Sequence, residues 1–597
     1  MKNSEKEKKE YQKLLCLLPL IIAVAVIPFL SRLHGENPEI SGFEWSGGGM
    51  YQKDIFLYWK AVSLNLLLPV LCIMLVANWP KDRKWKGEGR GWSMGIRLFL
   101  FLAVYELWML LSSVFSEYRD ICFHGAWAVY ESLYVILCYG LLAFYGFVVL
   151  DTEKKMRVVL YAVAAGAGLM AVIAIFQMFG LDFFRSHLGY FLTAGDTSWE
   201  NWQKTVYWYE KGRVQGTLAN PNNFGHYAAM VIPVCTGLAF SISKKGKKAF
   251  ALKIFFGCCA LFMLCAMCAA VSKSGMAALL GTSVLAVILF RKKLFRKGIA
   301  KWKVIMTIGL LGGFVVLAFV VKKDALVNNL KKAAKEFVNK APVDSFYGAE
   351  TTKDGLLVYC KGAVFQIRIK DTEQLCIMKE DGTPYPGTEY QGVHFSIQKE
   401  EEPVIYITDE SGKNWRFNSE YRYLSPLLGA VKCHFSEDVL RGREALATSR
   451  GYIWGRSIPL LKSRLLLGTG ADSFLFYFPQ DDYIARERFG YGDLLITKPH
   501  NMYLQAGIHA GIPGLAAYLA FFLGYAVWSF RIYFKESFCR EAAVMGASVF
   551  LGITSYLIAG LSMDSQVGVS PVAYVLLGVG FAANTIVENT KYKEERL

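Results

Sequence analysis

The chain has 597 residues, of which 54% are hydrophobic and 19% are charged. Because an ordinary soluble domain carries about 25% charged residues, this composition excludes a disordered chain and argues against a soluble enzyme. The net charge of +17 is concentrated between apolar runs of about 20 residues, the length that crosses a bilayer as a helix, so the sequence predicts a polytopic membrane protein rather than a nucleic-acid-binding one.

Twelve apolar segments predict transmembrane helices. If the N-terminus is cytoplasmic, the short loops on that side hold 32 Lys and Arg residues, against 8 in those on the opposite side. Positive residues accumulate on the cytoplasmic side of membrane proteins, so we expect both termini to be cytoplasmic and the protein to lie in the cytoplasmic membrane. The predicted spans cover about residues 14–31, 55–78, 96–115, 124–149, 158–180, 223–243, 252–271, 274–290, 304–321, 511–530, 541–562 and 568–588.

This topology places two long segments on the outer face, 181–222 and about 322–510. Within the second, residues 345–436 form short alternating runs separated by turn sequences such as EDGTPYPG, which is typical of β-strands. We therefore expect an all-α membrane bundle of about twelve helices with a small inserted extracytoplasmic β-rich domain. The predicted units are a bundle at 1–321, an insert at 322–444, an interfacial segment at 445–510 and the rest of the bundle at 511–597.

The first polar stretch on the predicted outer face is GRVQGTLANPNNFGHYAAM, residues 212–230. The Asn220-Pro221-Asn222 sequence predicts the start of a helix, and Arg213 supplies a cation just outside the bilayer. A helix N-terminus beside an arginine is a natural binding site for an anion.

The second stretch, residues 449–479, carries Arg450, Arg456 and Arg464 among Trp and Leu residues. This pattern favours an amphipathic helix that lies along the membrane surface. Arginine side chains at such a place can hold phosphate oxygens in a fork geometry.

The third stretch, residues 498–522, places His500 and Asn501 just before a predicted span. Histidine suits proton transfer near neutral pH, or donation to a phosphate. Together the three stretches fit a lipid-linked diphosphate, whose charge stays at the surface while its tail stays in the bilayer. No P-loop or cytoplasmic D-x-D motif indicates a nucleotide or a metal, and we expect no cofactor and no metal ligands.

The motifs R-V-Q-G-T-x-x-N-P-N-x-F-G, R-G-Y-x-W and H-N-x-Y-L-Q…G-I-P-G-L resemble the O-antigen ligase and polymerase superfamily. The resemblance implies metal-independent transfer of a glycan from a polyprenyl-diphosphate carrier to a glycan, lipid or protein acceptor. It also implies that Arg213 and Arg450 act on the diphosphate and that His500 is the essential histidine. The predicted substrate-binding residues are Asn222, Asn501, Arg456 and Arg464.

Two alternatives remain open from the sequence. A polymerase would use the same chemistry to extend a growing surface polysaccharide. A flippase or exporter of the lipid-linked glycan would instead depend on ionisable groups within spans, of which Glu106 and Glu131 are the main candidates.

Overall fold

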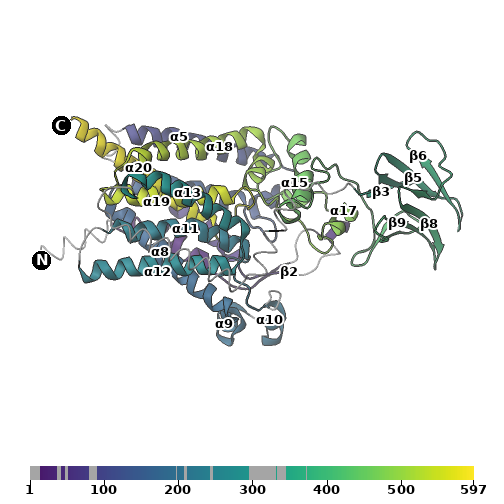
Figure 1. Ribbon diagram of the computed structural model, residues 1–597, viewed down its shortest axis with the longest axis horizontal. Helices are drawn as coiled ribbons and strands as arrows, with labels where there is room; N and C mark the ends of the chain where they lie inside the picture. The colour runs from purple at the N-terminus through teal and green to yellow at the C-terminus, as the bar shows by residue number, and fades with distance from the viewer. Residues whose placement is uncertain are drawn as a thin grey trace.

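The computed structural model describes residues 14–36, 40, 42–46, 52–79, 90–195, 198–206, 211–242, 246–294, 331, 344–371 and 373–596. Its long helices run side by side in a bundle, and a β-rich unit lies beyond one end of that bundle (Figure 1). The C-terminal end of the last helix, α20, lies at the opposite end of the bundle (Figure 1).

Nine of the described helices are long and apolar enough to cross a membrane, and two shorter apolar helical segments accompany them at Leu18–Phe29 and Leu133–Val149. The chain is therefore a multi-pass membrane protein. The predicted span at 304–321 lies outside the described residues, so the count of twelve stays a prediction. The nine helices are α3 (Tyr58–Ala77), α5 (Arg90–Val114), α8 (Glu153–Met178), α11 (Pro221–Ser241), α12 (Lys247–Ala269), α13 (Lys273–Leu294), α18 (Met502–Lys535), α19 (Glu541–Ala559) and α20 (Ser570–Arg596).

The helices differ in how far their neighbours surround them. The most apolar stretch of α20 is 94% buried and that of α19 is 83% buried, whereas that of α3 is 28% buried. A small residue lets two central helices approach closely, because a Cβ on Gly552 of α19 would lie 2.6 Å from the Met230 carbonyl of α11. Small residues at helix contacts are typical of membrane bundles, so α19 and α20 form the centre and α3 faces the lipid.

The fourth predicted span, 124–149, is wrong at its start, because the helix α7 (Leu133–Val149) begins later. Ser132 caps its first turn. The residues before it form a loop whose backbone N–H groups, at Ala126 and Glu131, donate to the carboxylate of Asp472 at 2.6 and 2.9 Å. A distant carboxylate therefore holds this apolar stretch out of the helix.

The helix α18 is interrupted at Gly511, where φ is +67° and the backbone leaves helical geometry. The interruption frees the carbonyls of Ile508 and His509, which accept the backbone N–H groups of Thr469 and Gly470 at 2.8 and 3.0 Å. A positive φ at this position favours glycine, because glycine has no Cβ. The loop after α15 is thus docked into the kink of α18.

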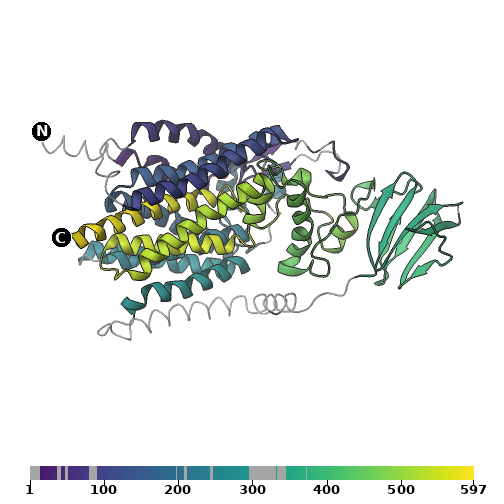
Figure 2. The ribbon, with the colours of Figure 1, turned by 90° about the horizontal axis from the view of Figure 1, so that it is seen from above.

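The remaining described elements are short, and α2 packs within the bundle, where a Cβ on Gly166 of α8 would lie 3.0 Å from the Val24 carbonyl. Among them, α15 lies across the long axis of the bundle in both views (Figures 1 and 2). This orientation agrees with the expected helix along the membrane surface. The elements are α2 (Leu18–Ala25), η1 (Ile27–Phe29), β1 (His34–Glu36), η2 (Glu44–Ser46), β2 (Gln52–Asp54), α6 (Arg119–His124), η3 (Phe183–Arg185), α9 (His187–Thr193), α10 (Trp199–Val206), α15 (Leu446–Ser463), α16 (Phe474–Tyr477) and α17 (Tyr483–Arg488).

The β-rich unit consists of two antiparallel sheets, one of four strands in the order β3-β4-β5-β6 and one of six in the order β12-β11-β10-β9-β8-β7. The inward side chains of both sheets join one apolar core, to which Tyr483 and Ile484 of α17 also belong. The predicted β-rich segment therefore contains strands throughout, and α17 links them to the bundle. The strands are β3 (Phe346–Thr352), β4 (Gly355–Cys360), β5 (Ala363–Ile369), β6 (Leu375–Lys379), β7 (Glu389–Tyr390), β8 (Val393–Lys399), β9 (Pro403–Thr408), β10 (Asn414–Phe417), β11 (Tyr423–Ser425) and β12 (Gly429–Val431).

Candidate active site

The chain enters α15 through a left-handed turn directly before Arg450. Ala447, Thr448 and Ser449 have φ values of 55°, 67° and 65°. Residues other than glycine avoid this region, and each one held there costs about 1–3 kcal/mol. Such strain gathers at functional sites, so the turn draws attention to the arginine that follows it.

His500 and Asn501 lie at the start of α18. The Asn501 side chain caps the helix by accepting the backbone N–H groups of Tyr503 and Leu504, both at 3.0 Å. Its amide also donates to the Leu561 carbonyl at 3.0 Å. These contacts show how Asn501 shapes the site, and they hold His500 beside the loop at 560–569, between α19 and α20.

That loop supplies Asp564, which lies against the histidine. The Nδ1 atom of His500 is 2.8 Å from Oδ2 of Asp564, and the backbone N–H of Asn501 donates to Oδ1 at 3.2 Å. The side chain of Asp564 is 6% exposed and that of His500 is 38% exposed. The carboxylate is therefore buried behind an imidazole whose other edge is accessible.

Three basic residues determine the charge state of this carboxylate. Burial by itself would raise the pKa of Asp564, but His500, Lys498 and Arg450 together hold it below its ordinary value. The ammonium of Lys498 donates to the Ser565 carbonyl at 3.2 Å. Burial lowers the pKa of Arg450, although the nearby Asp564 opposes that shift. We call Asp564, His500, Arg450 and Lys498 the Asp564 cluster.

Glu131 holds the loop that carries Asp564 in place through hydrogen bonds. The Ser565 hydroxyl donates to one carboxylate oxygen of Glu131 at 2.7 Å. The side-chain N–H of Gln505 donates to the other Glu131 oxygen at 3.1 Å. The side-chain oxygen of Gln505 accepts the backbone N–H of Ser565 at 3.0 Å. Glu131 thus positions the residues next to Asp564, a contact that the sequence did not indicate.

Arg213 lies on an adjoining loop, and Asn222 lies in the first turn of α11, which follows that loop. Asn220 caps α11 by accepting the Asn222 N–H at 2.7 Å, as the sequence predicts, and Arg213 is exposed before it. A Cβ on Gly568 would lie 2.9 Å from the Leu218 side chain. The loop that contains Arg213 is therefore packed against the loop that carries Asp564.

The other two predicted arginines are engaged elsewhere. Arg456 is 4% exposed and forms ion pairs with Asp438 at 2.8 Å and Asp482 at 2.7 Å. Arg464 is paired with Glu117. Only Arg450 of the three lies in the Asp564 cluster. The substrate-binding roles of Arg456 and Arg464 stay predictions, and the contacts of Arg456 are those of a structural ion pair.

Sequence reasoning missed Asp564 and Lys498 as site residues. Asp564 is the one charged residue in the short loop predicted at 563–567, and Lys498 lies two positions before His500. Asp564 and His500 both lie on the predicted outer face of the membrane, and this shared position was the signal from which the sequence could have paired them. Within the described part of the chain, no group of three or more His, Cys, Asp or Glu residues has the arrangement of a metal site.

The replacement Asp564→Asn is expected to destabilise the protein in a pH-dependent way. Because the folded-state pKa is below its ordinary value, the carboxylate stabilises the fold above the unfolded pKa of about 3.9. That contribution is lost as pH falls through the folded-state pKa. At pH 7 we expect a loss of about 1.5–3 kcal/mol, the usual worth of hydrogen bonds to a charged group.

Thermal unfolding of the purified protein between pH 7 and pH 3 measures this effect, with the exposed acid variant Glu401→Gln as the control. The gap between wild type and Asp564→Asn should close toward pH 3. A gap that stays constant over this range would show that the charge of Asp564 does not stabilise the fold.

These observations define a multi-pass membrane protein whose basic site lies where α15, α18 and the loop after α19 meet. Residues 258–519 match the family model described as O-antigen ligase, and this range contains Arg450, Lys498 and His500. The resemblance indicated by the motifs is confirmed: over these residues the chain is similar to the O-antigen ligase superfamily, whose members are membrane glycosyltransferases of polysaccharide synthesis. A search of curated proteins found no match.

Proposed function

We propose that the protein transfers a glycan from a polyprenyl-diphosphate carrier to an acceptor hydroxyl or amide on the outer face of the cytoplasmic membrane. The observation that carries this proposal is the contact between His500 and Asp564 at 2.8 Å amid two further cations. An imidazole oriented by a carboxylate and a set of cations suited to diphosphate are the two groups that the reaction needs.

The histidine serves as the base. In the tautomer with its proton on Nδ1, His500 donates to Asp564 and leaves Nε2 able to accept the proton of the acceptor hydroxyl. The acceptor oxygen then bonds to the anomeric carbon of the sugar. The bond between that carbon and the diphosphate oxygen breaks, and its electron pair leaves with the diphosphate.

The cations stabilise the leaving group. Arg450 and Lys498 lie beside Asp564, and Arg213 lies on the adjoining loop. Negative charge builds on the diphosphate as the glycosidic bond breaks, and fixed cations at that point lower the barrier. Asn222, with the capping residue Asn501, shapes the surroundings of the bound substrate.

The proposed sidedness rests on two observations. The Asp564 cluster includes Arg450 of α15, and α15 lies at the end of the bundle that bears the β-strands, opposite the C-terminal end of α20 (Figure 1). The Lys and Arg count of the loops assigns that opposite end to the cytoplasm. A site on the outer face has access to lipid-linked glycans and to acceptors that have already crossed the membrane.

The test is a transfer assay with purified protein in detergent, a defined polyprenyl-diphosphate oligosaccharide, a pool of acceptors and EDTA. Mass spectrometry should detect a new glycoside together with free polyprenyl diphosphate. The variant Arg450→Ala should slow the reaction by about 10²–10³-fold, as when a donor to a developing charge is removed. Transfer at the wild-type rate by Arg450→Ala at normal expression would remove Arg450 from the mechanism.

The same products separate the alternatives. A ladder of products indicates a polymerase, and a single block transfer indicates a ligase. The flippase alternative keeps one supporting observation: an oxygen of Glu106 is buried without a hydrogen-bond partner among the described residues. Transport of labelled lipid-linked glycan across liposomes without a new glycosidic bond, impaired by Glu106→Gln, would favour that alternative.

A further inference from the structure

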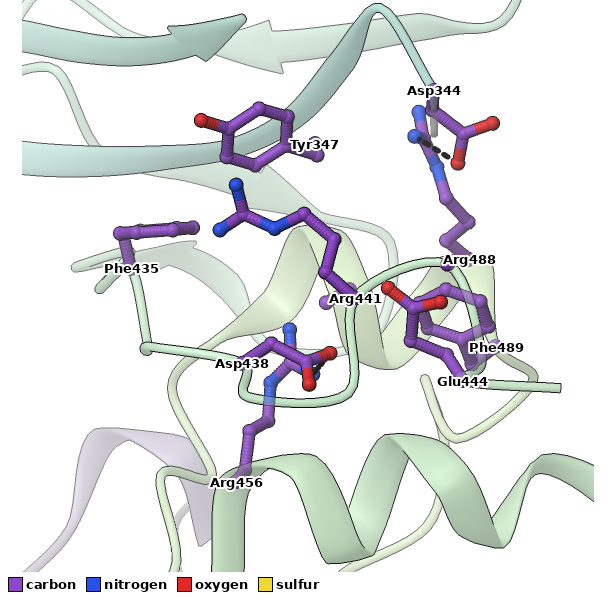
Figure 3. A pocket seen from close by; sticks show the side chains of 11 residues that line it. Asp344, Tyr347, Phe435, Asp438, Arg441, Glu444, Arg456, Arg488 and Phe489 are labelled. Carbon is purple, nitrogen blue, oxygen red and sulfur yellow. Dashed lines mark hydrogen bonds and ion pairs between the residues drawn. The ribbon is translucent and has the colours of Figure 1, made fainter. Parts of the chain in front are cut away.

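A cavity of about 200 Å³ lies between the β-rich unit and the helices next to the bundle. Its walls come from the start of β3, the segment 435–444, α15 and α17 (Figure 3). The cavity is therefore formed by the inserted strands and by the helix that carries Arg450 together. It is separate from the Asp564 cluster, whose residues do not line it.

Part of the wall consists of charges that neutralise one another. Arg488 pairs with Asp344 at 2.7 Å and with Asp409 at 3.0 Å. Arg456 pairs with Asp438 at 2.8 Å. These ion pairs fix the shape of the cavity wall. Each of these charged groups already has an oppositely charged partner in the protein.

Arg441 differs from these residues. Its guanidinium carbon lies 4.0 Å from the centre of the Tyr347 ring and 5.9 Å from that of Phe435, and Figure 3 shows it between the two rings. Among the residues that the structure describes, no carboxylate lies within ion-pair distance of it. The aromatic rings therefore hold the guanidinium of Arg441 at the cavity wall. Because arginine has five N–H donors, this group can donate hydrogen bonds to a ligand in the cavity.

Glu444 supplies a matching acceptor on the same cavity wall. Burial raises the pKa of its carboxyl group, although backbone N–H groups oppose the shift. Like Arg441, it has no ion-pair partner in the described part of the chain. Beside aromatic rings, the cavity thus offers one cation and one carboxyl group that have no ion-pair partner among the described residues.

The cavity is mechanically joined to the Asp564 cluster through α15. Arg456, at its wall, follows Arg450 by six residues on the regular part of the helix, which is about 9 Å along the axis at 1.5 Å per residue. The Glu444 carbonyl also accepts the backbone N–H of Tyr452 at 2.9 Å. A ligand in the cavity would therefore contact the same helix that carries Arg450.

We infer that this cavity binds one sugar unit of the acceptor or growing glycan, which rests on the proposed glycan transfer. Ring hydroxyls both donate and accept hydrogen bonds, so they match a cavity that is lined by both an arginine and a carboxyl group. The cavity is smaller than the ~300–1,000 Å³ of sites for drug-sized ligands, which suits a single ring. Its balanced charge suits a sugar better than a free phosphate.

Binding is tested with full-length protein in nanodiscs by saturation-transfer NMR. The probes are three disaccharides: one neutral, one N-acetylated and one that contains a uronic acid. We expect at least one to bind wild type, and Arg441→Ala and the near-isosteric Glu444→Gln each to weaken it about ten-fold, since each removes a hydrogen bond to a charged group. The control is Arg416→Ala, which removes an exposed arginine of the β-rich unit that is paired with Glu400.

The inference is overturned if no disaccharide binds wild type, or if both cavity variants bind as tightly as wild type. Transfer kinetics separate this inference from the proposed function. Arg441→Ala should raise the KM for the acceptor while leaving kcat nearly unchanged. Disaccharide binding without any transfer would refute the proposed function alone, whereas transfer with an unaltered acceptor KM in Arg441→Ala would refute the cavity's role alone.

Discussion

Replacing His500 with alanine is expected to lower kcat for glycan transfer by about 10²–10⁴-fold, the usual contribution of a general base. The protein should still fold, because Asn501 and not His500 caps α18. Donor binding should change much less than kcat, since the cations at Arg450 and Lys498 remain. The measurement is steady-state transfer by purified protein, with thermal unfolding as the check on folding.

The partner replacement Asp564→Asn should also lower kcat, by about 10–100-fold, as for outer partners of metal-bound histidines. The asparagine amide would donate to Nδ1 of His500, which moves the proton to Nε2 and removes the base. His394→Ala is the matched control, because His394 is 56% exposed in the β-rich unit. Full activity of His500→Ala would show that this histidine neither accepts the proton nor orients the acceptor.

The replacement Arg456→Ala is expected to destabilise the protein by about 3–5 kcal/mol, the usual cost of removing one partner of a buried ion pair. Asp438 and Asp482 are 3% and 1% exposed, so both carboxylates would be left uncompensated. Asp482 raises the pKa of Arg456 against the effect of burial. Since whole domains are stable by only about 5–15 kcal/mol, the thermal midpoint should fall steeply.

A matched arginine near the end of the same helix provides the control. Arg464 is 39% exposed and paired with an exposed Glu117, so Arg464→Ala should change stability by no more than about 1 kcal/mol. Adding Asp438→Asn and Asp482→Asn to Arg456→Ala should restore part of the loss, because the unpaired charges disappear. If Arg456→Ala unfolds like wild type but raises the KM for substrate, the predicted binding role is correct instead.

The arginines illustrate how far the sequence could go. Their spacing at 450, 456 and 464 in an amphipathic stretch correctly indicated a helix, α15, because burial of one apolar face leaves a periodic trace. Its place along the membrane surface stays a prediction. The family resemblance assigned Arg450 to the diphosphate, but the spacing of the arginines alone did not distinguish Arg450 from Arg456. The difference lies in Asp438 and Asp482, which reach Arg456 from other segments of the chain.

By itself, the sequence determined that this is a multi-pass membrane protein with an inserted segment of strands and a family resemblance carried by three motifs. Those properties follow from local composition and period, since a bilayer demands long apolar runs and a half-buried sheet demands alternation. Only the tertiary structure decided that Asp564 orients His500, that Glu131 supports their loop and that Arg441 lines a cavity beside α15. Each of these depends on contacts between residues far apart in the chain, for which a single sequence has no local signal.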